Sequence, residues 1–216
     1  MGVFNGSISV TKFFVEGELP SKQLSQTFLK NIHLRRFTEL TVDGEEEETS
    51  GWCVAGNGLD LELAHQQVFL NSFVVLGLRV DRWRIPRPLF KAQFAEAAAE
   101  HLSRTGKEKL SKRDKDEIKF RVNRKLRKKV IPSMRVFDVC WDLNRAELLF
   151  WCRATRTIDD LCVLFERTFS LTLREASPYT VADKLIGTSH AEQLCELEQT
   201  LFASQLPERK SEETSD

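Results

Sequence analysis

The sequence HLSRTGKEKLSKRDKDEIKFRVNRKLRKKVIP, residues 101–132, combines a helical pattern with a dense run of positive charge. Thirteen Lys and Arg residues against four acids give it a formal charge of +9, whereas the chain of 216 residues has a formal net charge of +0. Residues 118–131 hold seven bases and no acid. Charge segregated in this way is typical of a surface that binds a polyanion such as nucleic acid. The alternative, a merely solvated helix face, usually mixes the two signs.

The apolar residues of this stretch predict where its helix lies. They recur every four positions and make a narrow stripe along one side: Ile118, Val122, Leu126 and Val130. Ser111 is a suitable N-cap, and Pro132 cannot continue a helix. We therefore expect a helix that begins after Ser111, ends shortly before Pro132 and packs on the protein through its stripe.

The other side of this helix is expected to be basic. At 100° per residue, five bases fall opposite the stripe: Arg113, Arg121, Arg124, Arg127 and Lys128. A second basic cluster at residues 82–87 precedes the helix, and cations in both places can contact phosphates. The predicted DNA-binding residues are Arg82, Arg84, Arg87, Lys112, Arg113, Lys119, Arg121, Arg124, Lys125, Arg127, Lys128 and Lys129. Trp83 either packs under the loop or stacks on a base, and packing is favoured because a duplex exposes no base.

The remaining patterns predict an α+β fold with antiparallel sheets or hairpins and packed helices. Strand patterns cover residues 7–15, 68–80, 134–141 and 147–153, and the second of these is one long strand or a bent pair with Gly77 as a bulge. Helix patterns cover residues 21–32, 89–102, 157–169 and 191–201. An acidic loop is expected at residues 39–50.

The domain organisation follows from the same patterns. We expect one DNA-binding region over residues 1–205, with two lobes, 1–65 and 66–205, as the alternative. Residues 206–216 are expected to be a disordered polar tail, because they are rich in charge and nearly free of apolar residues.

The sequence shows no sign of catalytic chemistry. The four histidines are far apart, and neither a phosphate-binding loop nor a full dinucleotide-binding motif is present. Glu117-Ile118-Lys119 has a form found in some nuclease sites but lacks the further carboxylates that a metal-dependent nuclease needs. We therefore expect no enzymatic activity, no metal and no cofactor. No apolar run is long enough to span a membrane, and the five cysteines include no C-x-x-C pair, which favours a cytoplasmic protein.

The order of these segments resembles the bacterial recombination-associated protein family RdgC. The likeness is carried by Gly51-Trp52, by RWRIPRP at residues 82–88, by LSKRDKDEIK at residues 110–119, and by the segment from Ile131-Pro132 through Phe137 to the helix at residues 158–169. These motifs span residues 51–178. Members of that family usually continue further at the C-terminus, so the resemblance is to a short, C-terminally truncated variant.

The resemblance implies a nucleoid-associated protein that binds double-stranded DNA without sequence specificity and restrains RecA-dependent recombination. It also implies a homodimer that acts as a ring or a clamp. The strands at residues 134–141 and 147–153 could supply the dimer contact if one of them lies at a sheet edge. The alternative function is a protein-interaction module whose basic face binds an acidic partner or the acidic loop of a second copy.

Overall fold

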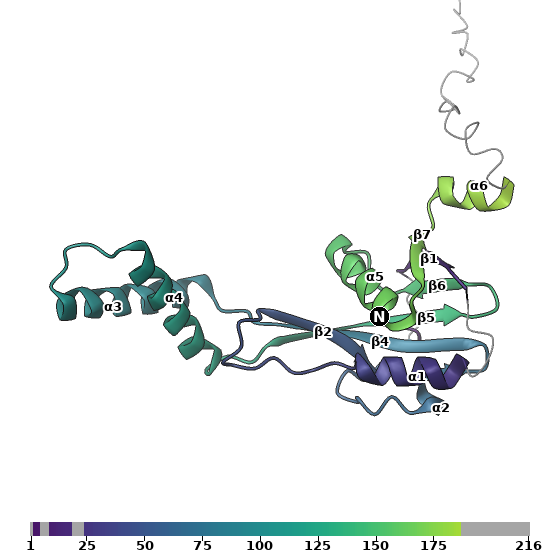
Figure 1. Ribbon diagram of the computed structural model, residues 1–216, viewed down its shortest axis with the longest axis horizontal. Coiled ribbons are helices and arrows are strands. Elements are labelled where there is room, and N and C mark those ends of the chain that lie inside the picture. The colour runs from purple at the N-terminus through teal and green to yellow at the C-terminus, as the bar shows by residue number, and fades with distance from the viewer. Residues whose placement is uncertain (1, 5–8, 19–23, 187–216) are drawn as a thin grey trace, which may run out of the picture. The chain divides into compact units, whose positions relative to one another are not determined.

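The computed structural model describes residues 2–4, 9–18 and 24–186. Residues Met1–Glu175 form one compact unit, and residues Ala176–Asp216 form a second. The first unit has an α+β fold built on an antiparallel sheet that curls into half a barrel (Figure 1). The expected α+β class is therefore confirmed.

The sheet joins strands from the beginning and the end of the first unit. Its strands follow the order β2-β4-β5-β6-β1-β7, with β3 pairing to β4, and all pairs are antiparallel. The strands are β1 (Thr11–Glu16), β2 (Glu48–Cys53), β3 (Phe69–Leu70), β4 (Phe73–Arg82), β5 (Ser133–Asp142), β6 (Glu147–Phe150) and β7 (Thr172–Glu175). β1 pairs with β6 and β2 pairs with β4, so the sheet joins strands from both sides of residue 65.

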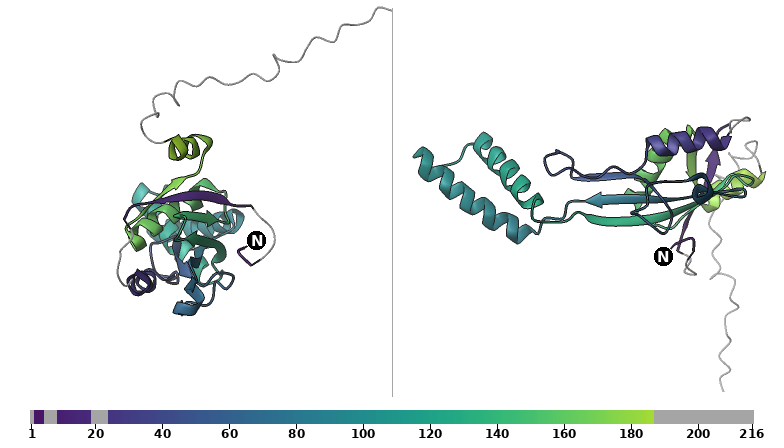
Figure 2. Two further views of the ribbon diagram at one scale, coloured as in Figure 1. Left: turned by 90° about the vertical axis from the view of Figure 1, so that its right-hand side faces the viewer. Right: turned by 90° about the horizontal axis from the view of Figure 1, so that it is seen from below.

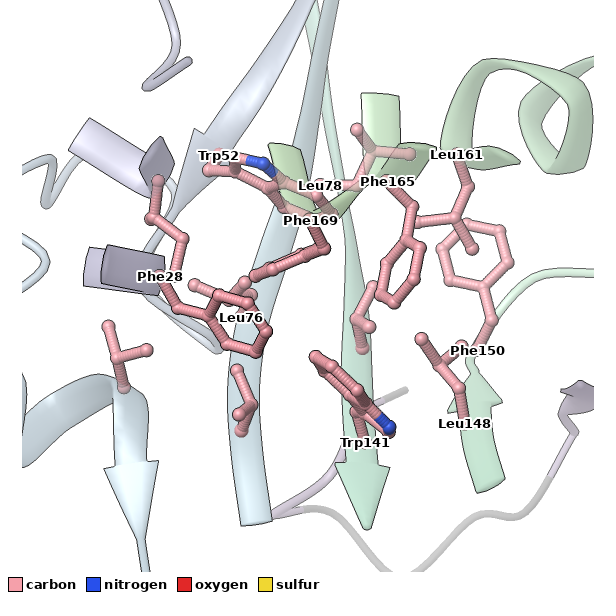
Figure 3. Close-up of a cluster of buried hydrophobic side chains, with 14 of the residues drawn as sticks. Phe28, Trp52, Leu76, Leu78, Trp141, Leu148, Phe150, Leu161, Phe165 and Phe169 are labelled. Carbon is pink, nitrogen blue, oxygen red and sulfur yellow. The ribbon is translucent and has the colours of Figure 1, made fainter. Parts of the chain in front are cut away.

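The helices of the first unit are α1 (Leu24–Leu34), α2 (His65–Val68), α3 (Arg87–Thr105), α4 (Lys112–Arg127) and α5 (Thr155–Phe169). Helices α1 and α5 pack together with the sheet, and their aromatic rings meet those of β5 (Figure 3). Phe28 lies 5.6 Å from Trp141 and 4.9 Å from Phe169, measured between ring centroids. Pairs of this kind stabilise a core beyond the area that they bury.

The Gly51-Trp52 motif has a structural role in this core. Trp52 is fully buried, and its indole Nε1 donates a hydrogen bond of 2.8 Å to Thr168 Oγ1 of α5. A Cβ atom on Gly51 would come within 2.5 Å of Phe37 Cα, so only glycine lets the two backbone segments approach. The motif therefore supports the fold, and it carries no information about a binding surface.

Helices α3 and α4 form a hairpin at a distance from this core. They are inserted between β4 and β5, and they lie beyond the end of these two long strands, away from α1 and α5 (Figures 1 and 2). The hairpin has a small core of its own, in which the predicted stripe packs against α3 and its flanks. This second core holds Ile118, Val122 and Leu126 with Ile85, Phe90, Phe94, Ala97 and Leu110.

The structure decides between alternatives that the sequence left open and corrects some boundaries. The run at residues 68–80 is the bent pair, because Asn71 adopts a positive φ of 55° and turns the chain between β3 and β4. Gly77 is not a bulge, since it pairs regularly with Cys53 and Asp138. Strand β6 ends at Phe150, three residues before the predicted end.

Other predictions fall outside the described residues. These are residues 7 and 8 of the first predicted strand, the helix start at Ser21, the helix at residues 191–201 and the tail at residues 206–216. In the second unit, the described helix is α6 (Pro178–Ile186). It begins with reciprocal hydrogen bonds, in which Ser177 N donates to Thr180 Oγ1 and Thr180 N donates to Ser177 Oγ.

The strands expected to form a dimer contact are interior strands. β6 pairs with β5 on one side and with β1 on the other, and β5 lies between β4 and β6. Five of their apolar residues pack in the main core: Phe137, Val139, Trp141, Leu148 and Phe150. On the β6 side, strand pairing covers residues 139–142 of β5, and within the described part of the chain residues 133–137 have no partner strand there.

Candidate nucleic-acid interface

Helix α4 begins and packs as the sequence predicts. Ser111 Oγ accepts a hydrogen bond from Asp114 N, and Asp114 Oδ2 accepts one from Ser111 N, each of 3.2 Å. Ile118, Val122 and Leu126 are buried against α3. The fourth predicted stripe residue, Val130, lies outside the helix, because α4 ends at Arg127.

Most of the predicted bases of α4 and its C-terminal end are exposed to solvent. The exposed residues are Lys112, Arg113, Lys119, Arg121, Arg124, Lys125, Lys128 and Lys129. Lys128 is the C-cap residue, and Lys129 follows it. Helix α4 belongs to a hairpin that extends away from α1 and α5 (Figure 1).

An acidic segment, residues 43–48, lies against this basic surface. Arg124 Nε donates a hydrogen bond to Asp43 Oδ1 in an ion pair. This hydrogen bond lowers the pKa of Asp43 and raises the pKa of Arg124. The acidic loop of the chain therefore contacts the basic helix of the same copy, which the sequence suggested only for a second copy.

Arg127 is not on an open face, contrary to the sequence prediction. Its residue exposure is 8%, its Nη1 donates a hydrogen bond to the carbonyl oxygen of Gly44, and its guanidinium lies 5.8 Å from the centre of the Trp83 ring. The helical angle is correct, but the acidic segment covers this side of α4. Arg127 is therefore a structural residue that joins α4 to the acidic segment.

The predicted basic cluster at residues 82–87 also contains both ion-paired and exposed arginines. Arg82 Nε pairs with Glu48 Oε2 at 3.2 Å, whereas Arg84 and Arg87 are exposed. Trp83 is half-buried, and its backbone N donates a hydrogen bond of 3.0 Å to the Glu47 carbonyl oxygen. Its ring packs beside Arg127, as the preference for packing over stacking predicts.

Acids of α3 flank one side of the basic helix. A groove of about 300 Å³ is lined by Glu96 and Glu100 of α3 and by Arg121 and Lys125 of α4. Lys119 pairs with Asp116 at 3.2 Å within α4. An exposed ion pair of this kind contributes little to stability, so Lys119 can exchange Asp116 for another anion.

Sequence reasoning missed two arginines that lie close to Arg82. Arg135 of β5 and Arg156 of α5 line one cavity with Arg82 and Arg84. Arg156 Nη2 lies 3.1 Å from Glu48 Oε2, the same oxygen that pairs with Arg82. A signal was present for Arg156, because a cation in the first turn of a helix opposes the helix dipole and calls for an anionic neighbour.

The described residues contain no cluster of three or more His, Cys, Asp or Glu side chains that could hold a metal ion. Cys53 and Cys152 are buried, Cys140 and Cys162 are partly buried, and Cys195 lies outside the described residues. Burial raises the pKa of Cys53 to about 12, so its thiol is protonated at neutral pH. None of the helices within the described ranges has the length and apolar character that a bilayer span requires.

Comparison with known proteins gives no independent assignment. No protein-family model matches the chain, and a search of curated proteins finds no match.

Proposed function

We propose that this protein binds double-stranded DNA without sequence preference, through contacts from α4 and residues 82–87 to phosphates. The observation that carries the proposal is the set of exposed Lys and Arg side chains on and just after α4, on a helical hairpin that extends beyond the sheet. Cations that neutralise phosphates supply affinity that does not depend on sequence.

The residue types on α4 support binding without base readout. Base edges are read mainly by bidentate Arg, Asn or Gln side chains that enter a groove. Helix α4 contains one amide side chain, Asn123, which is partly buried and lines a pocket with the acidic segment. Helix α4 therefore offers no exposed amide side chain for base readout, and the proposal assigns its exposed arginines to phosphates.

The resemblance to the RdgC family extends the proposal. By this resemblance the protein is associated with the nucleoid in the cytoplasm, modulates RecA-dependent recombination and acts as a dimeric clamp or ring. Since β5 and β6 are interior strands, we place the dimer contact at a strand with an open edge, such as β2 or β7. No catalytic activity, cofactor or membrane partner is part of the proposal.

One observation favours a second candidate, a module that binds an acidic protein. The acidic segment already engages Arg124 through Asp43 and Arg127 through the Gly44 carbonyl oxygen. An acidic peptide of a partner could contact the exposed bases of α4 in the same manner.

Titration of several unrelated duplexes of equal length, with an acidic peptide in parallel, tests the proposal. We expect all duplexes to bind with similar affinity. A preference for one sequence above about a hundredfold, the equivalent of one or two specific base contacts, would contradict it. Binding of the peptide without binding of any duplex would establish the second candidate instead.

A further inference from the structure

A cavity of about 210 Å³ lies where α5 begins, next to the ends of β2, β4 and β5. Its lining combines apolar residues, Val80 and Phe137, with the hydroxyl groups of Ser133 and Thr157 and with six charged side chains. Four of the charged groups are guanidinium groups and two are carboxyl groups: Arg82, Arg84, Arg135, Arg156, Glu48 and Asp160.

The charge of this lining is unbalanced. Four guanidinium groups against two carboxylates leave a formal charge of +2. Burial raises the pKa of Asp160, and the neighbouring Glu48 carboxylate raises it further. Arg156 adds a cation to the first turn of α5, a turn that contains no acid. The positive end of the helix dipole lies there as well, so the cavity favours a bound anion.

Glu48 shows how an oxygen is held in this cavity. Its Oε2 atom accepts from Arg82 Nε at 3.2 Å and from Arg156 Nη2 at 3.1 Å. Two guanidinium groups from different elements therefore converge on one carboxylate oxygen. Within the described part of the chain, the other two guanidinium groups, those of Arg84 and Arg135, have no ion-pair partner.

We propose that this cavity binds a phosphomonoester or inorganic phosphate dianion, with Arg84 and Arg135 as its main donors. A phosphate carries about −1.5 to −2 charges at pH 7 and offers several acceptor oxygens. Its charge matches the +2 of the lining, and its oxygens suit the planar donor pairs of arginine. Ser133 and Thr157 also line the cavity and carry hydroxyl groups that can donate to a phosphate oxygen.

This site shares Arg82 and Arg84 with the residues 82–87 of the proposed function and deepens it, since the cavity itself requires neither α4 nor a duplex. The phosphate can come from two sources, a free small molecule or the 5′ end of a nucleic acid. Both present the same group, so the experiment has to separate them.

Calorimetric titration with inorganic phosphate, against chloride at equal ionic strength, tests the site. Wild type should bind phosphate saturably. Arg135→Gln and Arg84→Gln should each weaken binding at least about tenfold, since each removes a charged hydrogen bond. Arg145→Gln, which removes an exposed arginine outside this cavity, is the matched control and should bind as wild type does.

Glu48→Gln provides a test in the opposite direction. It removes the carboxylate that holds Arg82 and Arg156, so phosphate should bind more tightly than to wild type. A loss of folding cannot produce a gain in affinity. No saturable binding to wild type, or equal binding by Arg135→Gln and Arg145→Gln, would overturn the proposal.

A pair of duplexes with 5′-phosphate or 5′-hydroxyl ends identifies the source. Tighter binding of the phosphorylated duplex that is lost in Arg135→Gln assigns the cavity to nucleic-acid ends. Equal binding of both duplexes, with intact binding of free phosphate, assigns it to a small molecule. If the protein binds phosphate but no duplex, the proposal that α4 binds DNA is rejected and the proposal for the cavity stands.

Discussion

Arg124 and Arg127 lie three residues apart on α4 but meet the acidic segment in different ways. Arg124 is about half exposed and pairs with the exposed carboxylate of Asp43. Arg127 is buried and donates to a backbone carbonyl oxygen beside Trp83. The exposed guanidinium of Arg124 can therefore change partners, whereas the buried guanidinium of Arg127 is held in place by its neighbours.

Charge reversal should therefore separate the two residues. Arg124→Glu should leave the thermal midpoint nearly unchanged, because exposed ion pairs contribute little. Arg127→Glu should lower the free energy of unfolding by at least about 2 kcal/mol, because it leaves a buried carboxylate facing a carbonyl oxygen. Chemical denaturation of both variants measures this difference. Equal stability of the two would show that the acidic segment does not cover Arg127 in solution.

Asp114 should make the stability of the protein depend on pH. Hydrogen bonds from Ser111 and Lys107 lower its pKa from 3.8 to about 2. A carboxyl group with a lowered pKa stabilises the folded state above its unfolded pKa and loses this effect as the pH falls through the folded value. Wild type should therefore lose stability relative to Asp114→Asn between about pH 4 and pH 2.

Denaturation of the two proteins at several pH values measures this difference. Glu117→Gln, which removes an exposed carboxylate of the same helix, is the control. A difference between wild type and Asp114→Asn that stays constant with pH would contradict the assignment.

The sequence predicts which residues cap a helix and which are buried when this depends on spacing within one helix. The cap at Ser111 and the burial of Ile118, Val122 and Leu126 follow from spacing within α4. The burial of Arg127 does not, because its partner Gly44 is 83 residues away in the sequence. For the same reason the cavity arginines, Arg135 and Arg156, were not predicted.

At the scale of elements, α4 packs against α3 and against the acidic segment. Its apolar stripe packs on α3, and the acidic segment contacts another side of it. The acidic segment continues to Glu48, which pairs with Arg82 and Arg156. The acidic segment therefore engages arginines from three elements: Arg124 and Arg127 of α4, Arg82 of β4 and Arg156 of α5.

This arrangement predicts that the acidic segment competes with DNA for the basic surface. Asp43→Asn should raise the affinity for a duplex about fivefold at low salt, the effect expected of one unit charge near a phosphate contact. Fluorescence anisotropy with a labelled duplex measures the change. Glu62→Gln, which removes an exposed acid outside the segment, should have a smaller effect. An unchanged affinity of Asp43→Asn would show that Arg124 does not contact DNA.

The sequence predicts most elements but not how the strands are ordered. Patterns within single segments identify the helices now seen as α1, α3, α4 and α5 and most strands. They do not show that β1 pairs with both β6 and β7, because that pairing depends on contacts between distant segments. For this reason the sequence could not show that the strands at residues 134–141 and 147–153 lie inside the sheet.

At the scale of the whole molecule, a formal net charge of +0 conceals a separation of charge. The sheet with α1 and α5 forms the main core, and the hairpin of α3 and α4 carries the exposed bases. The hairpin has its own small core, so its surface can be changed with little effect on the rest of the first unit. This separation makes the proposed function accessible to direct test.

The dependence of duplex affinity on salt tests the central claim most directly. Wild type is compared with Arg121→Gln/Lys125→Gln and with the control Lys30→Gln/Arg145→Gln, which removes two cations outside α4. For wild type, the logarithm of the association constant should fall linearly with the logarithm of salt concentration, with a slope of about −0.9 per phosphate neutralised. The slope of Arg121→Gln/Lys125→Gln should be less steep by the contribution of about two phosphates, and the slope of the control should equal that of wild type. A wild-type protein that does not bind duplex at low salt, or a slope that is equal in all three proteins, would contradict the account.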